Sequence, residues 1–245
     1  MSKSNHISTT EFATHFRSTY GLGKDEPLNL TQLLYSIDVI TVFKPLSIGF
    51  SGMAQQTGKY KFMLINSNHS LARQNFTICH ELYHLFYQQE FKTMLCSTGH
   101  FNRKDGVEYN ADCFAADLIL PDFGIVKEIP SEELRFNAIT LPTLLRIEHK
   151  FQCSRSALLF RLKIKKLIDK EFFDSHNKNI QRGAAEHGYT TNLYKPTNKK
   201  IEVVGNYGDK ARQKYIRDKI SESHYISLLQ DIGIDLDENI IDHVE

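Results

Sequence analysis

The stretch Phe76-Thr-Ile-Cys-His-Glu-Leu-Tyr-His-Leu-Phe86 decides how this chain folds, because its apolar residues recur at three- and four-residue steps. The residues that follow this spacing are Phe76, Cys79, Tyr83 and Phe86. Such spacing predicts an amphipathic helix, and the absence of Gly and Pro between residues 71 and 89 lets it extend over that range. His80 and His84 stand four residues apart and therefore share one face of the predicted helix.

The segment His80-Glu81-Leu-Tyr-His84 has the H-E-x-x-H pattern, in which two imidazoles one helical turn apart bind one Zn²⁺. We interpret Glu81 as the general base, which accepts a proton from water and then returns it to the leaving amine of a peptide. The alternative is an ordinary pair of core or surface histidines. The spacing, with a carboxylate between the two rings, favours the metal site.

The segments around this helix support the interpretation. Residues Tyr60 to Asn66 read as a short buried strand, and the polar turn that ends at Ser70 can cap the helix that follows. Residues 50–56 and Thr57-Gly58 complete a predicted hairpin. If strand 50–56 is an edge strand, it can hold an extended peptide by strand addition. An ordinary covered edge is the alternative.

A catalytic zinc site needs a third protein ligand and an open position. Glu90 lies six residues beyond the second histidine, and at about 100° per residue it points away from the metal. Glu108 is the better candidate, because it opens a second helical segment that Pro121 ends. Ala111 and Ala115 give that helix a small-residue strip for close packing. These residues alone leave open that Glu108 is a solvated acid near a helix N-terminus.

Two stretches carry a resemblance to a known family. The stretch 76–86 and the pattern Glu108-x-x-Ala-x-x-Phe-Ala-Ala-x-Leu-Ile-Leu-Pro121 together resemble the ImmA/IrrE family of bacterial metallo-endopeptidases. Further matches are Pro27-x-Asn-Leu, Ser51-Gly52 and the Ser154 to Leu162 segment. The resemblance covers roughly residues 10–168 and, weakly, residues 201–237. Tyr83 stands where Gly is usual in that family, and Asn110 stands where a further acid is common.

The resemblance implies a set of residue roles. His80, His84 and Glu108 bind zinc, and Glu81 is the catalytic base. It also implies that the substrate is a regulatory protein, such as a helix-turn-helix repressor or an antitoxin, often linked to mobile elements. The rival hypothesis is a noncatalytic zinc-fold module that sequesters a transcription factor or contacts DNA. The presence of Glu81 argues against a purely sequestering module.

We expect an α+β fold: a mostly helical zincin-like metallopeptidase domain over residues 1–168, with a small sheet packed on the motif helix. Residues 169–200 are polar and read as a linker or loop, and residues 201–245 as a small α/β appendage of unknown role. The other predicted helices span residues 10–20, 30–36, 140–150, 154–167, 209–219 and 221–232, and the other strands span 39–43 and 201–204. The pair 140–150 and 154–167 superficially suggests a DNA-binding helix-turn-helix, but its charges flank apolar residues as on any solvated helix.

Composition excludes several classes of protein. The 245 residues are 41% hydrophobic and carry a formal net charge of +1, which gives no electrostatic case for nonspecific binding to nucleic acid or membranes. The N-terminal residues lack the apolar core of a signal peptide, and no segment approaches the roughly 18 apolar residues of a membrane span. We therefore expect a cytoplasmic protein. Its cysteines, Cys79, Cys96, Cys113 and Cys153, lack the spacing of a zinc ribbon and are expected to be reduced.

Overall fold

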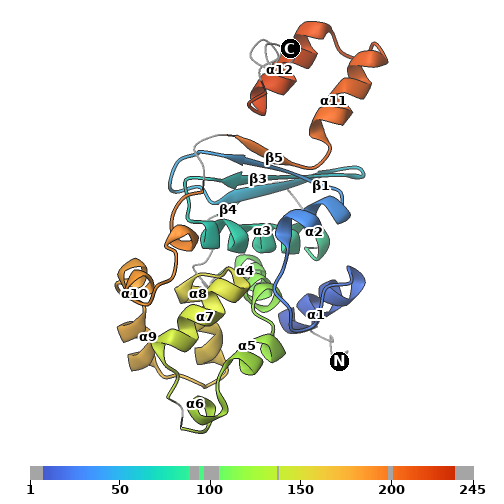
Figure 1. Cartoon of the computed structure of the whole chain (residues 1–245). Coiled ribbons are helices and arrows are strands. Elements are labelled where there is room, and N and C mark those ends of the chain that lie inside the picture. Colours follow the sequence, from blue (N-terminus) through green and yellow to red (C-terminus); the bar gives the residue numbers. More distant parts are fainter. Residues whose placement is uncertain (1–7, 89–93, 97–104, 137, 198–200, 235–245) are drawn as a thin grey trace, which may run out of the picture.

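The computed structural model describes residues 8–88, 94–96, 105–136, 138–197 and 201–234 (Figure 1). The strands are β1 (Val39–Lys44), β2 (Gly52–Thr57), β3 (Tyr60–Asn66), β4 (Met94–Cys96) and β5 (Glu202–Val204). The first helices are α1 (Thr9–Thr19), α2 (Leu30–Ser36), α3 (Leu71–Phe86), α4 (Gly106–Ile119), α5 (Asp122–Glu128) and α6 (Ser131–Arg135). The remaining helices are α7 (Leu141–Phe151), α8 (Arg155–Ile164), α9 (Lys170–His176), α10 (Ile180–Glu186), the 3-10 turn η1 (Asn192–Tyr194), α11 (Tyr207–Ile216) and α12 (Glu222–Asp231).

One mixed sheet organises the molecule, in the strand order β4-β2-β3-β1-β5. Strands β1 and β3 are parallel, and the other neighbouring pairs are antiparallel. Met63 and Ile65 of β3 are fully buried. Figure 1 shows α3 along one face of the sheet, with α4 and the following helices beyond it and with α11 and α12 on the other side of the sheet. The α+β fold predicted from the sequence is confirmed.

The predicted hairpin and motif helix are present, but β2 begins at Gly52 rather than at residue 50, and α3 ends at Phe86 rather than near residue 89. Strand β3 has the predicted bounds, and β2 pairs with it in antiparallel register. The side chain of Ser70 accepts a hydrogen bond from the backbone N–H of Arg73 and so caps α3. The helix ends at Phe86, because Tyr87 leaves the helical conformation as its C-cap. The idea that β2 is an edge strand is wrong, since β4 pairs with it from Gly52 to Ala54.

Helix α4 packs closely on α3 as its small residues predict. Ala111 and Ala115 have no exposed surface. The helix starts two residues before Glu108, because the side chain of Asp105 caps it by accepting the Glu108 backbone N–H at 3.3 Å. This start places Glu108 in the first turn, near the middle of α3.

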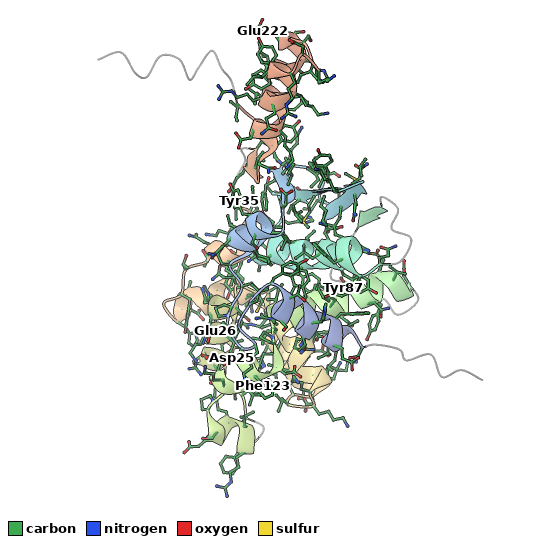
Figure 2. All side chains as sticks on the ribbon, turned by 90° about the vertical axis from the view of Figure 1, so that its right-hand side faces the viewer. Asp25, Glu26, Tyr35, Tyr87, Phe123 and Glu222 are labelled. Carbon is green, nitrogen blue, oxygen red and sulfur yellow. The ribbon has the colours of Figure 1, made fainter. Side chains whose placement is uncertain are left out.

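Aromatic side chains fasten α1 onto the α3–α4 pair. The rings of Phe12 and Tyr87 lie 4.6 Å apart between centroids, and those of Phe16 and Phe114 lie 5.9 Å apart. The hydroxyl of Tyr87, which is labelled in Figure 2, donates to the backbone oxygen of Phe12 at 3.1 Å. Burial raises the pKa of Tyr87 to about 12, so its hydroxyl stays protonated. Tyr87 therefore has a packing role.

The prediction of a linker or loop over residues 169–200 missed regular structure. Helices α9 and α10 and the turn η1 occupy this segment. Asp169 caps α9 by accepting the Phe172 backbone N–H at 2.8 Å, and Phe172 and Phe173 pack against the core. The next strand, β5, then pairs with β1 and extends the main sheet. The limits of the domains remain a prediction.

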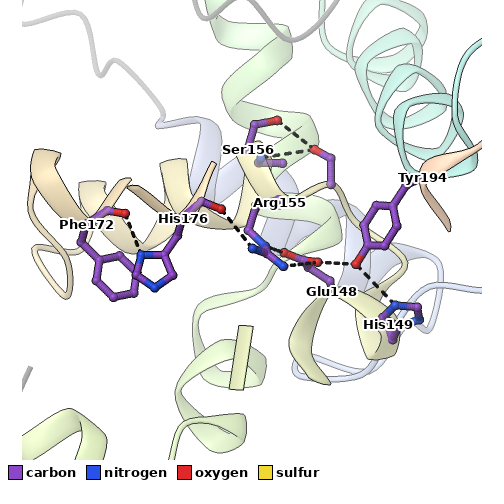
Figure 3. A network of polar contacts seen from close by, with 9 residues as sticks. Glu148, His149, Arg155, Ser156, Phe172, His176 and Tyr194 are labelled. Atoms are coloured by element: carbon purple, nitrogen blue, oxygen red, sulfur yellow. Dashed lines mark hydrogen bonds and ion pairs between the residues drawn. The ribbon is translucent and has the colours of Figure 1, made fainter. Parts of the chain in front are cut away.

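A buried ion pair connects this segment to the helical core (Figure 3). Glu148 of α7 and Arg155 of α8 are almost completely buried, and their side chains are joined by two contacts, one of them 3.2 Å long between Nη2 and Oε2. Arg155 also donates to the backbone oxygen of His176 at 3.0 Å, and the hydroxyl of Tyr194 donates to Glu148 at 2.6 Å. The pair therefore contacts this segment at two points, the last residue of α9 and the last residue of η1, although composition alone made the segment look like a linker.

Two other sequence expectations concern the chain as a whole. Cys79, Cys113 and Cys153 form no disulfide in the described structure; Cys96 lies outside the residues whose side chains are described. Within the described residues, no helix has both the length and the apolar character needed to cross a bilayer.

The ion pair leads to a prediction about stability. We expect Glu148→Ala to lower the free energy of unfolding by about 3–5 kcal/mol, because it leaves the buried guanidinium of Arg155 without its carboxylate. Tyr194→Phe removes one hydrogen bond to that carboxylate and should cost less, about 1.5–3 kcal/mol. Urea unfolding followed by circular dichroism measures both. Glu132→Ala, at an exposed position of α6, is the control. Equal stability of Glu148→Ala and this control would contradict the prediction.

Candidate metal site

The buried middle of α3 presents the H-E-x-x-H side chains. The sheet covers one side of the helix and α4 the other, so apolar residues fill most of its surface. His80, Glu81 and His84 are nevertheless each at most 1% exposed. Placing polar side chains in such an interior costs free energy unless other polar groups or a metal ion interact with them. The buried side chains of His80, Glu81 and His84 therefore require polar groups or a metal ion as partners inside the protein.

The structure brings Glu108 to the two histidines. Nε2 of His80 lies 3.0 Å from Nε2 of His84, and the carboxylate oxygens of Glu108 lie 3.2 Å from the first and 3.4 Å from the second. One potential ligand atom from each of the three residues lies within 4.8 Å of the other two. Glu108 is also partly buried, with 20% of its side chain exposed. The three side chains thus form a group with the geometry to hold one metal ion.

Two further residues orient the imidazoles, and the sequence reasoning missed both. Nδ1 of His80 lies 2.9 Å from Oδ1 of Asp112, and Nδ1 of His84 lies 2.5 Å from Oε1 of Gln88. An oxygen acceptor at Nδ1 requires the proton there, which leaves the lone pair on Nε2, the atom that faces Glu108. Spacing was the available signal, because Asp112 follows Glu108 by four residues and Gln88 follows His84 by four.

The electrostatics of the group favour the protonation states that bind a metal. Burial, together with the neighbouring His80, lowers the pKa of His84, which favours the neutral imidazole. Partial burial acts to raise the pKa of Glu108, but the hydrogen bond and positive charge of His80 in its doubly protonated form outweigh it, so the pKa is lowered and Glu108 is ionised even before that ring becomes neutral. A carboxylate and neutral imidazoles are the forms that ligate metal ions.

Glu81 lies against the backbone of the sheet. A Cβ atom built on Gly52 of β2 would lie 3.1 Å from Oε1 of Glu81, 2.5 Å from Cγ2 of Thr77 and 3.2 Å from the backbone oxygen of Leu64. Only glycine therefore fits here without a shift of its neighbours. Because Gly52 has no side chain, the backbone of β2 can lie close to the carboxylate of Glu81.

Tyr87, the C-cap residue of α3, does not join this group in the described structure. The side chain of Tyr87 contacts α1, through Phe12 and through Nδ1 of His15 at 3.2 Å. Glu90, which the sequence analysis set aside as a ligand, lies outside the described residues.

The fold and this group of side chains define a metallopeptidase-like domain, with the H-E-x-x-H helix between a small sheet and a second helix that supplies a carboxylate. The model of the Peptidase M78 family, described as the IrrE N-terminal-like domain, matches residues 39–163, just over half of the chain. The chain belongs to this family, and its membership indicates a metallopeptidase. The match confirms the resemblance found in the sequence. A comparison with curated proteins found no match.

Asp112 provides a test of how the imidazoles are held. We expect Asp112→Ala to weaken the affinity for a divalent metal ion, with Zn²⁺ as the probe, by about 10–100-fold, because the ring of His80 loses the acceptor that fixes its orientation. Asp112→Asn should retain most of the affinity, since its amide oxygen can accept the same hydrogen bond. Competition with a chromophoric chelator measures the affinity. Asp209→Ala, at an exposed carboxylate in α11, is the control. Unchanged affinity in Asp112→Ala would exclude this role.

Proposed function

We propose that this protein is a zinc-dependent endopeptidase that cleaves a regulatory protein in the cytoplasm. The observation that carries the proposal is the convergence of His80, His84 and Glu108 on one another, with the buried Glu81 directly following His80 in α3. Two imidazoles and one carboxylate are the donor set of catalytic zinc in several peptidases, where a fourth position stays open. In this proposal His80, His84 and Glu108 are the metal ligands and Glu81 is the general base.

The residues of the site fit this chemistry. Zinc held by such a group supplies Lewis acidity, which lowers the pKa of water to about 7. The carboxylate of Glu81 accepts the proton of the attacking water and then donates it to the nitrogen of the leaving amine. Asp112 and Gln88 keep the imidazoles oriented throughout, and Gly52 leaves space for the carboxylate of Glu81 next to β2.

The proposed substrate is a helix-turn-helix repressor or an antitoxin-like regulator, and the support for it is the family resemblance of the sequence. The second candidate function is a noncatalytic module that sequesters such a regulator. The carboxylate of Glu81 favours the enzyme, because a module that only binds needs no base beside its metal ligands. Loss of repression in cells would occur under both functions, so only variants that separate binding from cleavage distinguish them.

Metal content tests the ligand assignment. Purified protein should contain about one zinc per chain, and His80→Ala, His84→Ala and Glu108→Ala should each lose most of it, because two remaining ligands hold zinc poorly. Elemental analysis after dialysis measures the content. Glu132→Ala should keep the full content. Full zinc occupancy in the histidine variants would refute the site, and full occupancy in Glu108→Ala alone would require a different third ligand.

Replacement of the base tests the enzyme against the binding module. Glu81→Gln keeps the shape of the side chain and both imidazoles, so zinc should stay bound while turnover falls by about 10²–10⁴-fold, the range for removal of a general base. The readout is cleavage, by purified protein, of a candidate helix-turn-helix regulator, together with expression from the promoter which that regulator represses. Derepression by Glu81→Gln equal to that of the parent protein would favour sequestration instead.

A further inference from the structure

A groove lies on the side of the sheet opposite α3, between the sheet and the α11–α12 hairpin. Its volume is about 620 Å³. Its lining is largely apolar or aromatic, and includes Ile40, Phe62, Tyr207, Ala211, Ile220 and Leu228. Ile40 and Phe62 are paired neighbours on β1 and β3, so they form the floor of the groove on one sheet face. The groove therefore presents apolar surface on the side of the sheet that does not contact α3.

Basic residues line one side of the groove, above this apolar floor. They are Lys210, Lys214, Arg217 and Lys219, all from α11 and the turn after it. Lys210 lies 3.4 Å from Asp38, whereas the other three make no ion pair with any residue in the described parts of the chain. Lys61 also lines the groove, but its ammonium lies 5.0 Å from the Phe86 ring, toward α3. Among the described residues, no acidic side chain lines the groove.

We propose that this groove, bounded by α11, α12 and the β1–β3 face of the sheet, binds an acidic amphipathic segment of a partner protein. Apolar side chains of the segment fill the groove, and its carboxylates pair with Lys214, Arg217 and Lys219. Helix-in-groove recognition has this arrangement, with apolar anchors on one face of the ligand and charges at the rim. The inference goes beyond the proposed peptidase activity, because the groove lies across the sheet from the candidate metal site.

Two features favour a protein segment over other anionic ligands. Small-molecule sites have a few polar groups fixed in a mostly enclosed cavity, whereas Lys214, Arg217 and Lys219 are all exposed. Single-stranded nucleic acid binds through a series of free aromatic faces, but Lys59 and Lys210 each lie 5.7 Å from the centre of the Tyr60 ring. Of the Phe and Tyr rings that line the groove, this leaves Phe62 and Tyr207 for base stacking.

A binding experiment with the full chain tests this proposal. The probe is a labelled helical peptide of about 15 residues, with Leu at three- and four-residue steps and Glu elsewhere. We expect binding that weakens as salt rises. The variant with Lys214→Glu and Arg217→Glu should bind at least about tenfold more weakly, because both rim charges become repulsive. The matched control, Lys170→Glu with Lys178→Glu, reverses two exposed lysines in the α9 region and should bind normally.

Three further probes test separately the apolar contacts, the sign of the charge and the class of ligand. A peptide with Ser in place of Leu should bind weakly, and one with Lys in place of Glu should bind only the double charge-reversal variant. A single-stranded DNA of similar length should bind more weakly than the acidic peptide. Fluorescence anisotropy measures each affinity. The proposal is wrong if the acidic peptide fails to bind, if the Lys peptide binds the parent protein equally well, or if the DNA binds more tightly.

Discussion

The burial of α3 between the sheet and α4 is the constraint on which the rest of this structure depends. A helix in that position would ordinarily be apolar on every side, yet this one carries two imidazoles and a carboxylate in its buried middle. The cost of burying these groups is offset only if each has a polar partner or a metal ion. Helix α4 meets that need twice, through Glu108 at Nε2 of His80 and Asp112 at Nδ1 of the same ring. The close approach that makes this possible depends on Ala111 and Ala115.

This arrangement explains which parts of the fold and site the sequence could predict. The hairpin, α3 and α4 are visible in local patterns, because apolar spacing, a capping serine and a terminating proline act over a few residues. Glu108 was predicted from its place at the start of the second helical segment and from the family resemblance. Asp112 was missed because its role depends on the direction of a side chain across the α3–α4 interface, and Gln88 because a four-residue spacing alone does not show that its amide oxygen meets the ring of His84. A carboxylate four residues after Glu108 is visible in the sequence, but its contact with His80 is not.

In segment 169–200 the sequence failed to predict secondary structure, because its polar composition suggested a linker or loop whereas the segment forms α9, α10 and η1. Its helices are short and polar, so their own residues provide little signal. Their position depends on the Glu148–Arg155 pair, which lies in an earlier part of the chain. The place of β5 is likewise nonlocal, because nothing within residues 202–204 specifies β1 as its neighbour. The groove beside α11 is a product of that pairing, since β5 brings the final helices to the uncovered side of the sheet.

Gly52 links the alignment of the strands to the chemistry of the site. Strand β2 can pair with β3 in several ways that satisfy the backbone hydrogen bonds, and a shift by two residues would keep the same side chains on the same face. Such a shift would place the methyl group of Ala54 where Gly52 now meets Glu81 and Thr77. The misaligned sheet would therefore collide with α3 at its most crowded point. In this protein the side chains of Thr77 and Glu81, the second of which is the base in our proposal, therefore also disfavour a hairpin shifted by two residues from the observed register.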